Sequence, residues 1–240
     1  MTLSASNIVQ VNSGSTGSAN ASSVTMTLPT ATSANHELVA VLATSVGNDS
    51  LGRGWIAHFP SGFSVNGAEL SFTPVPQLRV VSKGTTAGET SWVVSITNPD
   101  GSPGSDAICW WIAEVSGLHA DPATDPNVGS GAVNGSTATT LVITDDLGVN
   151  GAADEVCVAA FANRIASGTP KTVSSIANTT TQPGTWTRLG TTAVTTKSTG
   201  PNVRLDVYDK FPGAVGKRDA TVTWSASVIG AAGLVNAYTS

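Results

Sequence analysis

Three histidines are the first residues to consider as bases or metal ligands: His36, His58 and His119. They lie far apart in the sequence, and none has a second His, a Cys or a Glu at the spacing of a metal-ligand motif. Serine is abundant, yet no serine stands in the Gly-x-Ser-x-Gly pattern of a nucleophile between a strand and a helix. The sequence therefore predicts no metal site, no cofactor and no catalytic triad, and we expect a protein that is not an enzyme.

Carboxylates are the other groups that could do chemistry, because two of them together can hydrolyse a glycoside. The adjacent pairs are Asp145 with Asp146, and Asp154 with Glu155. Neighbouring residues of a strand point to opposite faces, so neither pair forms a site by itself. Glu114 stands near the end of a Trp-rich run, where an inward carboxylate is costly unless it is paired. We expect a structural or surface role for Glu114.

An acidic segment from His119 to Asn127 contains two Asp-Pro steps and could supply oxygen ligands to calcium. It lacks the pattern of an EF-hand loop, and Asp-Pro steps are commoner as turn formers. We therefore predict a turn here, with calcium binding as the alternative. A hydrolase whose site is assembled from distant loops is the remaining catalytic alternative.

Tryptophan outnumbers the other aromatic residue types: the chain has six Trp, five Phe and two Tyr. Trp110 and Trp111 are consecutive in an apolar run, so in a strand they must face opposite sides. One indole can fill the core, whereas the other can lie at an interface or stack on a sugar ring. Trp110 and Trp111 are therefore the candidate interface or sugar-stacking residues, and burial of both between layers is the alternative.

The two cysteines, Cys109 and Cys157, each lie inside an apolar run. This placement predicts two buried free thiols that act as small hydrophobic residues. A disulfide between them, which would need adjacent strands with close Cβ atoms, is the alternative.

Short β-type runs separated by Gly, Pro, Asn, Asp and Ser are the dominant pattern of the chain. Two runs, Glu37–Thr44 and Glu155–Ala162, are nearly all apolar, and we expect them to be central strands covered on both faces. No window of about 11 residues or more has a helical period, so no helix is predicted. The polar segments Gly129–Ser136 and Thr191–Gly200 are expected to be loops. The fold class predicted from these patterns is all-β.

The two halves of the chain, about 7–118 and 128–240, contain similar runs in the same order. The matching pairs include Val24–Leu28 with Thr139–Ile143, Glu37–Thr44 with Glu155–Ala162, and Gly54–Ile56 with Thr185–Thr187. Two packed antiparallel sheets bury such strands best. We therefore predict one antiparallel, jelly-roll-like β-sandwich domain over residues 1–240 with two pseudo-repeated halves. Ordinary strand periodicity is the alternative explanation of the match.

Charge and hydropathy exclude two classes of partner. Only 11% of the residues are charged, the net charge is -5, and no Lys/Arg cluster is present to bind a phosphate backbone, so nucleic acid is not an expected partner. No apolar stretch approaches the ~20 residues of a membrane helix, so no membrane insertion is expected. The N-terminal residues lack the basic start and apolar run of a signal peptide, which indicates assembly in a cytoplasm.

The chain resembles the jelly-roll proteins of tailed-phage virions in three places. The first is the apolar strand Glu37–Thr44 followed by a Gly-Trp step at Trp55. The second is a strand ending at Lys83 before an Ala-Gly turn at Gly88, and the third is the strand that closes in Glu114–Leu118. The likeness is greatest to small minor tail or capsid decoration proteins of phages that infect actinobacteria.

This resemblance implies a non-enzymatic structural protein on the exterior of a virion, acting by self-association and docking. Its partners would be itself and other virion proteins, and host-surface carbohydrate is a further candidate. The low charge of the surface and the second indole of the Trp pair favour a homo-oligomer, with a trimer expected by analogy. The alternative function is a carbohydrate- or receptor-binding β-sandwich module.

Overall fold

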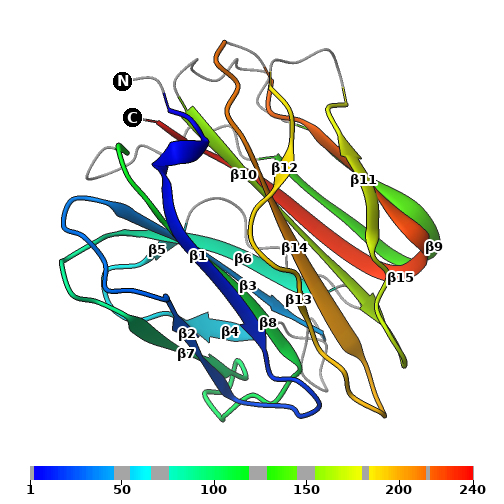
Figure 1. Ribbon diagram of the computed structural model, residues 1–240. Helices are drawn as coiled ribbons and strands as arrows, with labels where there is room; N and C mark the ends of the chain where they lie inside the picture. The colour runs from blue at the N-terminus through cyan, green and yellow to red at the C-terminus, as the bar shows by residue number, and fades with distance from the viewer. Residues whose placement is uncertain are drawn as a thin grey trace.

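The computed structural model describes residues 3–45, 55–65, 76–118, 129–144, 155–179, 184–214 and 217–239. In these ranges a short 3₁₀ turn, η1 (Ala5–Asn7), precedes fifteen β-strands, and no α-helix is present. Every strand pair is antiparallel. The predicted all-β antiparallel fold is therefore confirmed (Figure 1).

The first half of the chain, residues 3–118, forms two sheets. A five-stranded sheet has the order β1-β8-β3-β6-β5, and a three-stranded sheet has the order β2-β7-β4. Their strands are β1 (Ile8–Ser15), β2 (Ser23–Thr27), β3 (Glu37–Thr44), β4 (Ile56–His58), β5 (Ser64–Val65), β6 (Gln77–Gly84), β7 (Ser91–Thr97) and β8 (Ile108–Val115). β3 pairs along its whole length with both β6 and β8, and all its residues are buried, so its predicted central place is confirmed.

The second half, residues 129–239, forms one sheet of seven strands. They are β9 (Gly129–Ile143), β10 (Glu155–Ile165), β11 (Val173–Ala177), β12 (Thr187–Arg188), β13 (Ala193–Val194), β14 (Asn202–Lys210) and β15 (Ala220–Thr239). The order is β11-β15-β10-β14-β12, with β9 paired to β15 and β13 paired to β14. β10 lies between β15 and β14, as expected of the second apolar run.

Two long strands of the second half, β9 and β15, each take part in two layers. The pairing of β15 with β9 shifts register between Thr223 and Gly230. Before the shift β15 pairs with β11, and after it β15 pairs with β10. The expected loop at Gly129–Ser136 is wrong, because this segment is the first part of β9. Its backbone groups pair with β15, and such pairing does not require apolar side chains.

The order of strand pairing is the same in the two halves. β3, β6 and β8 correspond to β10, β14 and the second part of β15, while β2, β7 and β4 correspond to the second part of β9, the first part of β15 and β11. The expected match of Gly54–Ile56 with Thr185–Thr187 does not hold, because β4 pairs with β7 whereas β12 pairs with β14. An internal duplication and a jelly-roll origin remain predictions.

Three hydrophobic cores lie between the layers formed by these sheets. The first-half core is built only from residues of the first half, between its two sheets. The second-half core is built only from residues of the second half. The central core draws equally on both halves and lies between their large sheets. Each half is thus a β-sandwich, and the two sandwiches pack against each other through their large sheets (Figure 1). The predicted antiparallel β-sandwich is therefore confirmed, in the form of two sandwiches that share the central core.

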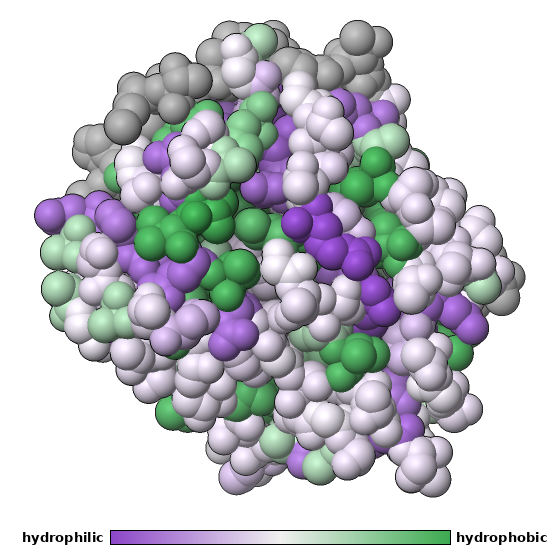
Figure 2. Space-filling model, in the orientation of Figure 1, coloured by the Kyte–Doolittle hydropathy of each residue, from purple (hydrophilic) through white to green (hydrophobic). Residues whose placement is uncertain are grey.

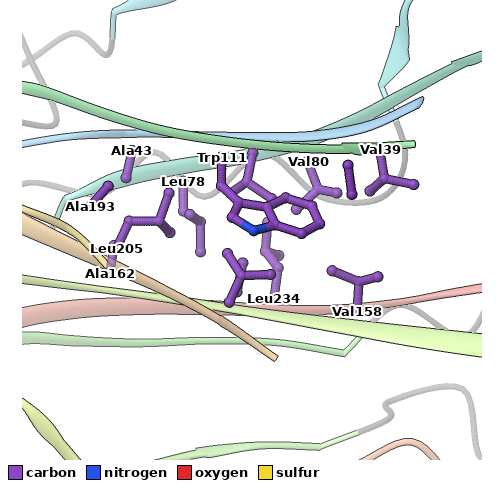
Figure 3. Close-up of a cluster of buried hydrophobic side chains, with 14 of the residues drawn as sticks. Val39, Ala43, Leu78, Val80, Trp111, Val158, Ala162, Ala193, Leu205 and Leu234 are labelled. Carbon is purple, nitrogen blue, oxygen red and sulfur yellow. The ribbon is translucent and has the colours of Figure 1, made fainter. Parts of the chain in front are cut away.

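Strand alternation explains how one sheet serves two cores. In β3, Val39 and Val41 face the central core, whereas Leu38 and Leu42 face the first-half core. Figure 3 shows Trp111 between the two large sheets, with side chains from both halves around it. Because both faces of β3 must exclude water, the run contains no polar alternation.

Both cysteines are free and buried, so the predicted free thiols are confirmed. Cys109 lies in the central core and Cys157 in the second-half core. Burial raises the pKa of the Cys109 thiol above its ordinary value, which keeps the thiol protonated at neutral pH.

Candidate functional site

The Trp pair lies inside the molecule. Trp110 is 8% exposed and belongs to the first-half core, and Trp111 is 1% exposed and belongs to the central core. The Trp111 indole N–H donates a hydrogen bond to the backbone carbonyl of Leu189 in the other half, at 2.9 Å. This placement confirms that both indoles are buried between layers, and it corrects the expectation that one indole is left for a partner or a sugar ring. The core that receives the second indole is supplied by the other half of the same chain.

The chain has few charged side chains, and many of them are buried. The sequence has 11 Lys and Arg and 16 Asp and Glu residues, and ten of those in the described ranges are buried. Buried charges are stable only when they are paired or hydrogen-bonded. Their removal from the surface leaves a protein whose outside is even poorer in charge than its composition indicates.

Glu114 is fully buried and satisfied by three hydrogen bonds. Its Oε1 accepts from Nδ1 of His36 at 2.7 Å and from the backbone N–H of Ser33 at 2.8 Å. Its Oε2 accepts from Nε2 of Gln10 at 2.5 Å. Burial alone would raise the pKa of Glu114, but these donors hold it below the ordinary value. The expected structural role of Glu114 agrees with this geometry, because the carboxylate ties the segment before β3 to β1 and β8.

The pair of His36 and Glu114 has the arrangement of a base and its orienting acid. A catalytic triad needs a third group, a nucleophile within hydrogen-bond reach of the other imidazole nitrogen. Among the described residues, Glu114 is the partner of the His36 ring, and no hydroxyl hydrogen-bonds to it. The sequence reasoning missed this pair because 78 residues separate the two side chains.

A second charged cluster lies on β14 and the neighbouring edge. Asp206 is buried and accepts hydrogen bonds from Nε of Arg204 at 2.6 Å and from the Thr192 hydroxyl at 2.6 Å. Nη2 of Arg188 lies 3.3 Å from the same carboxylate and donates to the Tyr208 hydroxyl. Figure 2 shows a hydrophilic band across this view, where β14 lies in Figure 1. Two guanidinium groups share one carboxylate here, so the cluster carries a positive charge that can attract an anion.

Asp209 is a buried carboxyl group on the opposite face of the same strand. Burial raises its pKa to about 6, although a backbone hydrogen bond acts in the opposite direction. Its neighbours on that face of β14, Val207 and Leu205, belong to the central core. Asp209 thus lies at the end of the contact between the two halves.

The outer face of the β2-β7-β4 sheet carries no formal charge in the described strands. Its residues alternate with the buried ones and are Ser23, Thr25, Thr27, Ser91, Val93, Ser95, Thr97, Ile56 and His58. Val93 is 58% exposed, the largest exposed fraction among the exposed large hydrophobic residues, and Ile56 lies on the adjacent β4. Nε2 of His58 is hydrogen-bonded to the Thr97 hydroxyl at 2.8 Å. This face therefore presents hydroxyl and aliphatic groups together with the imidazole of His58.

The outer face of the second half has the same chemistry. The strands there are the second part of β9, the first part of β15, and β11, which present Thr140, Val142, Thr221, Thr223, Ser175 and Ala177. Val142 is 46% exposed. We call this face and its counterpart on β2, β7 and β4 the two outer faces. The alternation of Thr, Ser and Val in Ser91–Thr97 was the sequence signal that could have identified them.

The remaining expected site residues are distributed as follows. Asp145, Asp146, Asp154 and the segment from His119 to Asn127 lie outside the described residues. Glu155 is buried and forms an ion pair with Arg218. Within the described ranges, no three His, Cys, Asp or Glu side chains gather as metal ligands would. No helix in those ranges has the length and hydropathy needed to cross a membrane.

Comparison of the chain with protein-family models, with curated proteins and with solved structures found no match.

Proposed function

We propose that this chain is a non-enzymatic structural protein that acts by association through its two outer faces. The observation that carries the proposal is the chemistry of these faces: β-sheet surfaces, rich in Thr, Ser and Val, without an Asp, Glu, Lys or Arg in the described strands. Soluble monomers usually intersperse charges on such surfaces to prevent association. A surface that omits them in both halves is suited to permanent contact.

A second copy of the chain is the partner that fits these faces best. Neither face offers a charge that would select an oppositely charged partner, so the complementary surface must itself be uncharged. The other outer face of a neighbouring copy has this property, and it carries the exposed Val142 as the first face carries the exposed Val93. Contact between unlike faces of successive copies would build a ring or an array.

The exterior of a tailed-phage virion is the setting we propose for this association, as a minor tail or capsid decoration protein. The resemblance in Glu37–Thr44 and Glu114–Leu118 supports it, and a particle surface offers repeated neighbours for repeated faces. A carbohydrate-binding module has weaker support. All six indoles of the chain are buried or half-buried, whereas stacking on a sugar needs an exposed aromatic face.

Sedimentation velocity of the full-length protein tests the proposal. We expect an assembly larger than the monomer, and we expect Val93→Asp or Val142→Asp to dissociate it, because each places a charge in the contact. The matched controls are Ser18→Asp and Ser167→Asp, which add the same charge at exposed positions away from the outer faces. A parent protein that is monomeric at all concentrations, or variants that assemble as the parent does, would refute association through these faces.

A further inference from the structure

Lys210, the last residue of β14, is fully buried although its side chain is a primary amine. Nζ lies 4.5 Å from the centroid of the Trp186 ring and donates a hydrogen bond to Oδ1 of Asn178 at 3.0 Å. Asn178 directly follows β11, which belongs to the outer layer of the second half. The contact therefore joins two layers across the second-half core.

The surroundings hold both side chains in place. Nδ2 of Asn178 donates to the backbone carbonyl of Gly184 at 3.1 Å, which fixes the orientation of the amide. Gly184 has a φ of +82°, and a Cβ there would come within 2.8 Å of Cγ of Lys210. The backbone thus packs directly on the stem of the lysine, and only glycine fits this position without displacement.

The same surroundings favour the neutral, nucleophilic form of the amine. Burial lowers the pKa of Lys210, although the negative charge of Asp219 acts in the opposite direction. A desolvated lysine with a lowered pKa is an activated nucleophile. Its neighbour in the pair is an amide carbonyl, which is an electrophile.

A carboxyl group that can carry protons lies at the same end of these strands. Asp219 is buried and immediately precedes β15. Ala177 pairs with Thr221, so Asn178 and Asp219 lie at the same end of the β11–β15 pair. Asp219 also acts electrostatically on Lys210, so its carboxyl group lies in the neighbourhood of the contact between Lys210 and Asn178.

We propose that Lys210 and Asn178 form an intramolecular isopeptide bond, with Asp219 as the proton carrier. The neutral amine attacks Cγ of Asn178, and a bond forms between Nζ and Cγ. Asp219 takes a proton from the attacking nitrogen and delivers it to Nδ2. The bond between Cγ and Nδ2 then breaks, and Nδ2 leaves as ammonia. Every atom is accounted for, and no oxidant, reductant or cofactor is needed.

The first half of the chain contains a lysine at the position that corresponds to Lys210. Lys83 on β6 corresponds to Lys210 on β14, and its Nζ lies 5.8 Å from the centroid of the Phe63 ring. Its ammonium group forms an ion pair with Glu89 instead of contacting an amide. The cross-link is therefore expected in the second half alone, where it ties β14 to the end of β11.

Intact-mass spectrometry of the purified, unfolded full-length chain is the test. We expect the parent mass to be lower than that of the sequence by one ammonia molecule. After trypsin, residues 172–188 and 205–217 are expected as one branched peptide, because an acylated Lys210 is not cleaved. Asn178→Asp keeps the shape of the side chain and should lose one water instead of ammonia. Lys210→Arg should have the full mass.

Lys83→Arg is the matched control and should still lose ammonia. A folded parent protein with the full sequence mass and no branched peptide would overturn the proposed bond. Formation of the bond at the parental rate in Asp219→Asn would overturn the role of Asp219 as proton carrier. Mass and peptide connectivity do not depend on assembly, so both outcomes are independent of the function proposed above.

Discussion

Trp110 and Trp111 are neighbours in β8, yet their indoles lie in two different hydrophobic cores. The strand sends successive side chains to opposite faces, and both faces of the sheet are covered. Trp110 holds the first sandwich together, whereas Trp111 joins it to the second through a hydrogen bond to Leu189. The large sheet of each half is thus the shared wall of two cores.

Replacing each indole separately should distinguish these two cores. Trp110→Ala and Trp111→Ala each remove a large buried side chain, and we expect each to lower the free energy of unfolding by about 3–5 kcal/mol. Hydrogen exchange should differ between them. Trp111→Ala should expose amides of β10 and β14 as well as β8, because its cavity lies between the halves. Faster exchange confined to the first half in both variants would contradict the shared core.

The central strands should not tolerate a charge. Val41→Asp or Val158→Asp would bury an unpaired carboxylate in the central core and is expected to destabilise the fold by on the order of 3–5 kcal/mol. Ser18→Asp is the matched control, because its side chain is exposed away from the outer faces, and its melting temperature should stay near that of the parent. Thermal melts of the three variants measure this. Equal melting of Val41→Asp and parent would show that β3 is not central.

Asp209 should make the fold more stable in mild acid than at neutral pH. Its pKa rises from 3.8 to about 6 in the folded state, so the folded chain binds the proton more tightly than the unfolded chain. The stabilising contribution is complete below the unfolded pKa and is lost as the pH rises through about 6. Asp209→Asn should raise stability at pH 7–8 and remove this part of the pH dependence. Denaturant unfolding at a series of pH values is the measurement; an unchanged profile would be inconsistent with the burial of this carboxyl.

Glu114 should have the opposite dependence. Its folded pKa is lowered from 4.5, so its contribution is present above that value and is lost as the pH falls through the lower folded pKa. Glu114→Gln replaces hydrogen bonds to a charged acceptor and should cost about 2 kcal/mol at neutral pH. The difference from the parent should shrink in acid. A constant difference from neutral pH to strong acid would show that Glu114 is not ionised in the folded protein.

The sequence predicted the elements of the fold better than their arrangement. Continuous apolar runs such as Glu37–Thr44 identify central strands, since only a strand covered on both faces lacks polar alternation. The same pattern cannot show what covers the second face. In the structure the other half of the chain covers it.

The candidate sites were less predictable for a related reason. Glu114 and His36, or Lys210 and Asn178, meet only because distant strands pair. The spacing of these residues along the sequence therefore does not predict the contacts. The outer faces could have been predicted from the sequence, because Ser91–Thr97 alternates buried and exposed positions and the exposed residues are uncharged. What such a face contacts depends on the assembly.

Reconstruction of the proposed virion by electron microscopy tests association through the two outer faces. We expect copies on the particle exterior, with the faces around Val93 and Val142 buried in contacts between neighbouring copies. Each contact should exceed the ~800 Å² of incidental packing. Copies that touch their neighbours only through small, wet contacts and leave both outer faces open to solvent would contradict it.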